Sequence, residues 1–231
     1  MKNFQLFMLP FGGGNETSYV KFEPFLDPAI QMINGEAPGK GRRIKEPLLK
    51  NLYLIAEEYY KQFKPQIKEP YAIYGHSMGA YLAHLITQRI QEDKLPLPKH
   101  LFLTSKIAPS RNYNKKRSLM TNEEFVAHLK ELKGMPEAVL NNEELLQIFL
   151  PVIRTDFDAI DSYKYIPQNP YPVDMTVICG TRENVPDDQL TDWKKETTGS
   201  FRFERWEGDH FWIFDHIPEL CSLINQTLSK Y

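Results

Sequence analysis

The chain has 231 residues, of which 42% are hydrophobic and 13% aromatic. This apolar content is enough for one sizeable core, so the length favours a single domain over 1–231 rather than several small ones. The net charge of −2 lacks the basic surplus of an electrostatic nucleic-acid binder, and no tract is dominated by one residue type, which excludes collagen-like and low-complexity chains.

The first ten residues and the cysteines bear on the cellular compartment. Met1 to Pro10 lack both the apolar stretch and the small-residue cleavage site of a signal peptide. No run approaches the roughly 18 apolar residues that a membrane-spanning helix needs. Cys179 and Cys221 are too few for a disulfide framework, and no Cys/His cluster suggests a metal. We therefore expect a cytoplasmic protein without a metal site.

Short apolar runs alternate with amphipathic helical patterns along most of the chain. The expected strands are 4–9, 29–33, 71–74, 101–103, 173–179 and 201–206. The expected helices are 47–63, a helix that follows the strand at 71–74 and reaches about 91, 186–197 and 215–228. This alternation is typical of an α/β domain with a mostly parallel sheet flanked by helices.

Strand signals vanish between about 109 and 169, where helical patterns dominate. Asn122 is expected to cap a helix that ends at Gly134, and an apolar stripe from Leu145 to Ile153 predicts another helix. Such a stripe usually packs against other apolar side chains. We therefore expect 109–169 to be a helical lid inserted into a core formed by 1–108 and 170–231.

A G-x-S-x-G motif stands at Gly75-His76-Ser77-Met78-Gly79. It lies between a predicted strand and a predicted helix, as it does in the α/β-hydrolase fold, where a strained turn raises the serine hydroxyl above the sheet. The alternative is a serine in an ordinary strand-to-helix turn. The flanking elements favour the first interpretation, with Ser77 as the nucleophile.

A serine hydroxyl needs a positioned base, and in this fold the histidine follows the acid late in the chain. His210 lies in the loop after the last predicted strand, at the same sheet edge as Ser77. His216 is its positional rival, but it falls in the terminal helical pattern, where a capping or surface role is expected. The remaining histidines precede any suitable acid or lie in the predicted lid: His76, His84, His100 and His128.

The third member must be a carboxylate that orients the imidazole. Glu183 is the first acidic residue after the strand at 173–179. Asp187 and Asp188 follow a proline, where acidic side chains commonly complement the start of a helix. Asp209 neighbours His210 in the chain, which places its side chain poorly to face that ring. Glu183 is therefore the predicted acid, with the other three as alternatives.

Two backbone amides are needed to hold an oxyanion. The amide of Met78, directly after the nucleophile, supplies one. The glycine-rich stretch from Leu9 to Gly14 follows the first predicted strand, and Gly12 is the predicted second donor, with its neighbour Phe11 as the alternative. Without a nucleophile nearby, the same stretch would be interpreted as a tight turn that binds no ligand.

The chain as a whole resembles the type II thioesterases that accompany nonribosomal peptide and polyketide synthases, over nearly its full length. The motifs that carry the resemblance are Leu9–Gly14, Pro38–Arg42, Gly75–Ala80, Ala108–Pro109, Gly134–Pro136, Leu150–Pro151, Arg154, Asp156, Tyr163, Gly180, Trp193 and Gly208–Phe211. Three positions depart from the family. It usually has Asp where Glu183 stands, often a small non-glycine residue at Gly12, and frequently a glycine at Asp209.

The resemblance implies a serine thioesterase that releases acyl or aminoacyl groups from the phosphopantetheine arm of carrier proteins, through an acyl-serine intermediate. Such an enzyme clears mis-primed or stalled synthases, uses no cofactor of its own and has acyl or peptidyl carrier domains as partners. We expect a monomer. A generic serine esterase or lipase acting on oxygen esters or acyl-CoA is the alternative, since the fold hosts many chemistries. A hydrolase-like binding module without activity is disfavoured by the complete set of Ser, acid and His.

Two basic runs are candidates for contact with an acidic carrier domain. They are Arg111, Lys115, Lys116 and Arg117, and Lys40, Arg42, Arg43 and Lys45. A run of charges is usually only a solvated surface. Neither run therefore enters the predicted site.

Overall fold

A computed structural model of the chain describes residues 4–112, 117–134 and 137–231. Its centre is a six-stranded sheet in the order β2-β1-β3-β4-β5-β6, in which every pair of neighbours is parallel. The strands are β1 (Phe4–Leu9), β2 (Ile30–Asn34), β3 (Tyr71–His76), β4 (His100–Thr104), β5 (Asp174–Gly180) and β6 (Phe201–Trp206). The predicted parallel sheet is confirmed.

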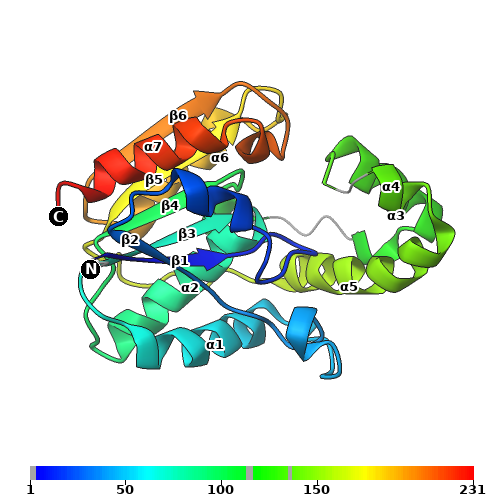
Figure 1. The fold of residues 1–231 in the computed structure, drawn as a ribbon, viewed down its shortest axis with the longest axis horizontal. Helices are drawn as coiled ribbons and strands as arrows, with labels where there is room; N and C mark the ends of the chain where they lie inside the picture. The colour runs from blue at the N-terminus through cyan, green and yellow to red at the C-terminus, as the bar shows by residue number, and fades with distance from the viewer. Residues whose placement is uncertain (1–3, 113–116, 135–136) are drawn as a thin grey trace.

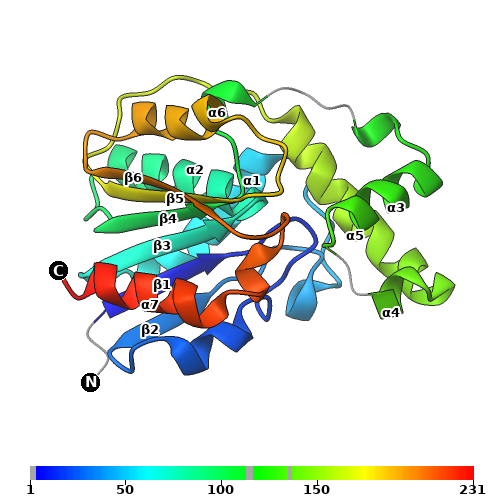
Figure 2. The same ribbon diagram turned by 90° about the horizontal axis from the view of Figure 1, so that it is seen from above.

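Helices cover both faces of this sheet (Figures 1 and 2). The α-helices of the described residues are α1 (Leu52–Phe63), α2 (Met78–Glu92), α3 (Asn122–Glu131), α4 (Glu137–Leu140), α5 (Glu143–Ser162), α6 (Asp187–Thr191) and α7 (Ile217–Leu228). The pair α1 and α2 packs on one face, and α7 packs on the other together with a short 3-10 helix at Val20–Phe25.

Strand β1 shows why the strands are continuous apolar runs rather than alternating ones. Phe7 and Leu9 belong to the core cluster beneath α1 and α2, whereas Leu6 and Met8 belong to the cluster beneath α7. Successive side chains of a strand point to opposite faces, and both faces of this sheet are covered. Every residue of the strand is therefore buried.

The helices expected from 47, from 122 and over 186–197 differ from the prediction in their boundaries, and local hydrogen bonds explain the first two differences. The helix expected from 47 begins at Leu52, because the Asn51 side chain accepts from two amides of the first turn. The cap of α3 is Thr121 rather than Asn122, since Thr121 and Glu124 form a capping box. The helix expected over 186–197 divides into α6 and a 3-10 helix at Asp192–Glu196.

Helices α3, α4 and α5 lie between β4 and β5 in the chain and project to one side of the sheet (Figure 2). They share a small apolar cluster built on Phe125, Leu129 and Phe157. The buried residues of α5 lie in its carboxyl half, from Thr155 to Asp161, so this half is the one packed against the core. A role for 109–169 as a lid stays a prediction.

None of the helices in the described parts of the chain combines the length and the apolar character that crossing a bilayer requires.

Candidate active site

Ser77 occupies a sharp turn between β3 and α2. Its backbone has φ of 55° and ψ of −113°, a conformation that side chains other than glycine rarely adopt. The two motif glycines permit the turn. A Cβ on Gly75 would lie 2.1 Å from the Gly79 carbonyl oxygen, and a Cβ on Gly79 would lie 2.1 Å from the Leu9 carbonyl oxygen. The strand and the helix that the motif requires are thus both present.

The structure brings the three predicted side chains together at the carboxyl edge of the sheet. His210 Nε2 lies 3.0 Å from Ser77 Oγ, and His210 Nδ1 lies 2.6 Å from Glu183 Oε2. His210 is 15% exposed and Glu183 is 9% exposed. These are the contacts by which a base activates a serine and an acid orients the base.

The other carboxylate oxygen of Glu183, Oε1, also accepts hydrogen bonds. Oε1 accepts from Ser105 Oγ at 2.6 Å, from the Gly180 amide at 2.9 Å and from Cys179 Sγ at 3.2 Å. Burial by itself raises the pKa of Glu183, but the bond to His210, the charge of that ring and the donors together lower the pKa to about 2. The carboxylate is therefore ionised at neutral pH. It favours the tautomer in which Nε2 of His210 accepts the serine proton.

Ser105 is a site residue that the sequence analysis missed. It follows β4 directly, has φ of 54°, and its hydroxyl donates to Glu183 while accepting from Trp212 Nε1 at 2.9 Å. Trp212 is fully buried. The available signal was position: a polar residue at the carboxyl end of a parallel strand faces the same edge as Ser77.

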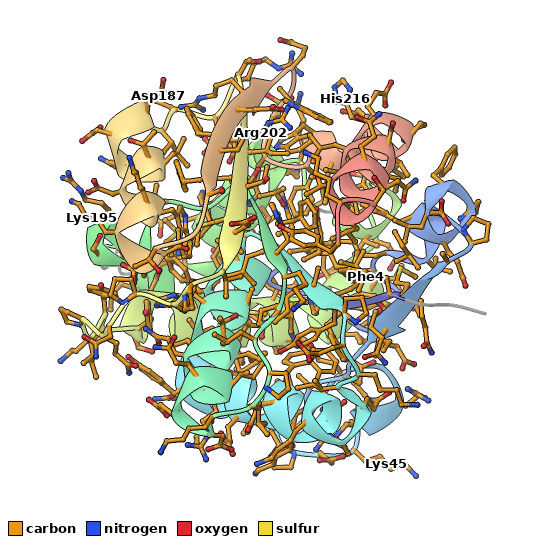
Figure 3. All side chains as sticks on the ribbon, turned by 90° about the vertical axis from the view of Figure 1, so that its left-hand side faces the viewer. Phe4, Lys45, Asp187, Lys195, Arg202 and His216 are labelled. Carbon is orange, nitrogen blue, oxygen red and sulfur yellow. The ribbon has the colours of Figure 1, made fainter. Side chains whose placement is uncertain are left out.

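The rival residues lie elsewhere. Asp187 pairs with Arg205 at 2.8 Å, and Asp188 beside it is exposed. His216 Nε2 lies 2.9 Å from the carbonyl oxygen of Glu207. Figure 3, seen from the side opposite the α3–α5 segment, shows Asp187 and His216 at the periphery of the molecule. The structure therefore favours Glu183 and His210 over them.

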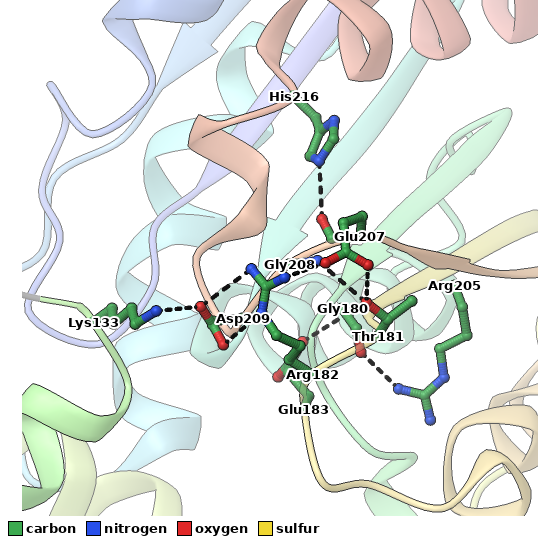
Figure 4. A network of polar contacts seen from close by, with 10 residues as sticks. All are labelled: Lys133, Gly180, Thr181, Arg182, Glu183, Arg205, Glu207, Gly208, Asp209 and His216. Atoms are coloured by element: carbon green, nitrogen blue, oxygen red, sulfur yellow. Dashed lines mark hydrogen bonds and ion pairs between the residues drawn. The ribbon is translucent and has the colours of Figure 1, made fainter.

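A network of charged side chains lies around the loop that carries Glu183 (Figure 4). The Asp209 carboxylate accepts from Lys133 Nζ at 2.6 Å and from Arg182 Nε at 3.1 Å. Arg182 precedes Glu183 in the chain, and Asp209 precedes His210. The ion pair between Arg182 and Asp209 therefore connects the loop of the acid to the loop of the base. Lys133 follows α3 and adds a contact from the inserted segment. Asp209 therefore has a role other than triad acid.

The two predicted oxyanion donors, Met78 and Gly12, come from different segments near the serine. Met78 opens α2 immediately after Ser77, and Gly12 lines the same cavity as Ser77. The amide of the next residue, Gly13, donates to Asp156 Oδ2 at 2.6 Å. Gly13 is thus engaged elsewhere. The assignment of the two donors stays a prediction.

The serine opens into a cavity of about 390 Å³. Its walls come from both the sheet edge and the inserted helices, and they include Phe11, Leu129, Phe157, Ile160 and Phe211. A mostly apolar cavity of this size is suited to hold a small organic group beside the hydroxyl.

The two basic runs do not form a free cationic surface in the described residues. Lys45 is exposed, as a solvated run of charges would be (Figure 3). Lys40 is buried instead. Lys115 and Lys116 lie outside the described residues, as do Met135 and Pro136 of the family motifs. The arginines pair with acidic side chains: Arg42 with Glu16, Arg43 with Glu46 and Glu58, Arg111 with Asp192, and Arg117 with Asp161.

The profile of the thioesterase domain matches residues 4–228. The chain belongs to the thioesterase domain family. It is 30% identical over 226 residues to the gramicidin S biosynthesis protein GrsT of Aneurinibacillus migulanus, a match that covers 97% of this chain and 88% of GrsT.

Solved structures agree with this assignment. The type II thioesterase BorB from the borrelidin biosynthetic cluster superposes with a TM-score of 0.88 at 29% identity, covering 96% of this chain and 91% of BorB. ClbQ from the colibactin NRPS/PKS pathway superposes with a TM-score of 0.93 at 28% identity, covering 99% and 98%. The predicted α/β-hydrolase fold and the resemblance to type II thioesterases are confirmed, and the chain is a thioester hydrolase.

Proposed function

We propose that this thioesterase hydrolyses acyl and aminoacyl thioesters on the phosphopantetheine arm of synthase carrier domains, and so clears synthases that are mis-primed or stalled. The observation that carries the proposal is the continuous series of hydrogen bonds from Glu183 through His210 to Ser77 beside a cavity. The names of the similar structures support the substrate class, since BorB belongs to a biosynthetic cluster and ClbQ to an NRPS/PKS pathway.

The first half-reaction transfers the acyl group to the enzyme. His210 Nε2 takes the hydroxyl proton of Ser77 as Oγ attacks the thioester carbonyl carbon. The carbonyl oxygen becomes an oxyanion, which the amides of Met78 and Gly12 hold by hydrogen bonds. The C–S bond then breaks, and His210 returns the proton to the departing sulfur. The products are an acyl-serine and the free thiol of the arm.

The second half-reaction frees the serine. His210 takes a proton from water, the resulting hydroxide attacks the acyl carbon, and the same two amides hold the oxyanion again. The C–O bond to Ser77 breaks, and the serine oxygen recovers the proton from His210. A carboxylic acid leaves, and Glu183 stabilises the imidazolium in both halves. These steps require no cofactor.

Two further features support the setting of the proposed reaction. Every side chain invoked comes from one chain, so a monomer suffices. Cys179 and Cys221 are buried free thiols. Free thiols are typical of proteins in the reducing cytoplasm, where we propose that the enzyme meets its carrier-bound thioester.

The test compares three substrates that carry the same acyl group: an acyl-loaded carrier protein, the acyl-CoA and a p-nitrophenyl ester. We expect the highest kcat/KM on the carrier protein. Ser77→Ala should abolish turnover of all three, because each reaction passes through the acyl-serine. Much faster turnover of the oxygen ester than of the carrier-bound group would overturn the proposal in favour of a general esterase.

A further inference from the structure

Two of the family motifs take no part in the proposed reaction, yet the structure brings them into contact. Lys40, from the segment Pro38–Arg42, forms an ion pair through Nζ with Asp156 Oδ2 on α5. The two residues are 4% and 1% exposed. An ion pair so far removed from water contributes little net stability, because desolvation of both charges offsets their attraction. Its use must therefore lie in what it holds in place.

The same Asp156 oxygen also accepts from the Gly13 amide at 2.6 Å. Gly13 has φ of 84° and follows Gly12, the proposed oxyanion donor. A charge-assisted bond to a backbone amide is among the stronger hydrogen bonds in proteins. Asp156 therefore fastens the turn one residue away from the donor.

Neighbouring side chains of α5 close on the same turn. A Cβ on Gly13 would lie 2.7 Å from Ile153 Cγ1, and a Cβ on Gly12 would lie 3.4 Å from Phe157 Cε2. Ile153 and Phe157 flank Asp156 on one face of the helix. The glycine-rich turn is thus seated on α5 by contacts on both sides of the carboxylate.

A glycine-rich turn is conformationally free by itself, whereas an oxyanion donor acts only when its direction is fixed before the reaction. We propose that Asp156 is a positioning residue for the oxyanion hole: paired with Lys40, it holds the Gly12–Gly13 turn so that the Gly12 amide points at the developing oxyanion. This inference rests on the proposed role of Gly12. It gives the inserted helix α5 a part in the chemical step in addition to its part in the cavity wall.

The experiment measures kcat per active serine, counted by titration with a fluorophosphonate. Asp156→Ala should lower kcat by about 10²-fold with KM within about twofold of wild type. The reason is that a misdirected Gly12 amide no longer donates to the oxyanion, which forms only in the transition state. Asp156→Asn should lose about tenfold, since the amide oxygen still accepts from Gly13 but no longer pairs with Lys40.

Two inhibitors separate positioning from folding. A trifluoromethyl ketone analogue of the acyl group adds to Ser77 and forms a hemiketal oxyanion, so its affinity should fall in parallel with kcat. An amide analogue of the thioester forms no oxyanion and should bind Asp156→Ala as it binds wild type. The kcat of wild type and of each Asp156 variant is measured on the thioester and on a p-nitrophenyl ester. In both substrates the carbonyl oxygen of the same acyl group becomes the oxyanion, so the expected losses are independent of which one the wild type prefers.

Asp161→Asn is the matched control, because Asp161 is also a buried acid of α5 but pairs with Arg117 rather than with Lys40 and the Gly13 amide. It should lower Tm while kcat per active serine and ketone affinity stay at wild-type values. Equal losses in the Asp156→Asn and Asp161→Asn variants would overturn the inference. Wild-type kcat and ketone affinity in Asp156→Asn would do so as well, even if Asp156→Ala fails to fold.

Discussion

Glu183 stands where the family usually has aspartate, and the longer side chain is held at both of its oxygens. Oε2 faces His210, while Oε1 receives the Ser105 hydroxyl and the Gly180 amide. A flexible acid is poorly suited to orient a base, because rotamer freedom blurs its direction. The donors around Oε1 remove that freedom. Glutamate can thus replace aspartate here without loss of geometry.

The identity of the acid is tested by paired substitutions. Glu183→Gln should lower kcat by about 10³-fold or more, because the amide no longer stabilises the imidazolium and permits the wrong tautomer. Asp187→Asn and Asp188→Asn should stay within about twofold of wild type, since both side chains lie on α6, away from His210. Thioester hydrolysis at saturating substrate measures all three. A loss in either aspartate variant that matched the loss in Glu183→Gln would move the assignment.

Ser105 is tested by removing its hydroxyl. In Ser105→Ala, Glu183 loses a donor and the buried Trp212 indole loses its acceptor. A buried donor left without a partner costs about 1–3 kcal/mol, so the free energy of unfolding should fall by that amount. The kcat should fall too, because the acid is less firmly directed. Urea unfolding and turnover measure the two effects, and wild-type values for both would show that the hydroxyl supports neither.

At the scale of elements, the contact between α2 and β1 links the nucleophile to the oxyanion turn. Gly79 lies in the first turn of α2, and its α-carbon side faces the carbonyl of Leu9 at the end of β1. The glycine-rich turn begins directly after that carbonyl. Close approach of the helix and the strand therefore fixes the spacing between Ser77 and Gly12.

Gly79→Ala sets two effects against each other. Alanine favours a helix over glycine by about 1 kcal/mol. Its Cβ would, however, lie 2.1 Å from the Leu9 oxygen, and backbone must move to relieve that clash. Overpacking of this kind costs about 1–3 kcal/mol or more, so we expect a net loss in the free energy of unfolding together with a fall in kcat. Urea unfolding decides the sign, and a more stable variant would contradict the argument.

At the scale of the whole molecule, the sequence predicts what depends on local pattern and on chain order. The apolar runs predict the strands, and the order Ser77, Glu183, His210 predicts which loops meet at the carboxyl edge. Contacts between distant segments leave no such local trace. The position of Ser105 at the end of β4 indicates the sheet edge on which it lies, but its bond to Glu183 and the pair of Lys40 with Asp156 are seen only in the structure. The expected start of α1 at 47 precedes the Asn51 cap because Pro47 stands there and proline is favoured in the first turn of a helix.

The dependence of stability on pH tests the electrostatics of the folded chain. In the folded state the pKa of Glu183 is lowered to about 2, from an ordinary value of 4.5 that the unfolded chain retains. Folding therefore favours the ionised form. The resulting stability is fully present above about pH 4.5 and is lost as the pH falls towards 2.

Glu183→Gln removes this contribution, because glutamine does not titrate. We expect wild type to lose more of its free energy of unfolding than Glu183→Gln when the pH is lowered from about 7.5 to about 3.5. Groups without contact to position 183 titrate alike in both proteins and cancel in the comparison, so urea unfolding at the two pH values reports on Glu183 together with the His210 ring that is bonded to it. An equal loss in the two proteins would mean that folding does not favour the carboxylate as an anion. The orientation of His210 would then need another source.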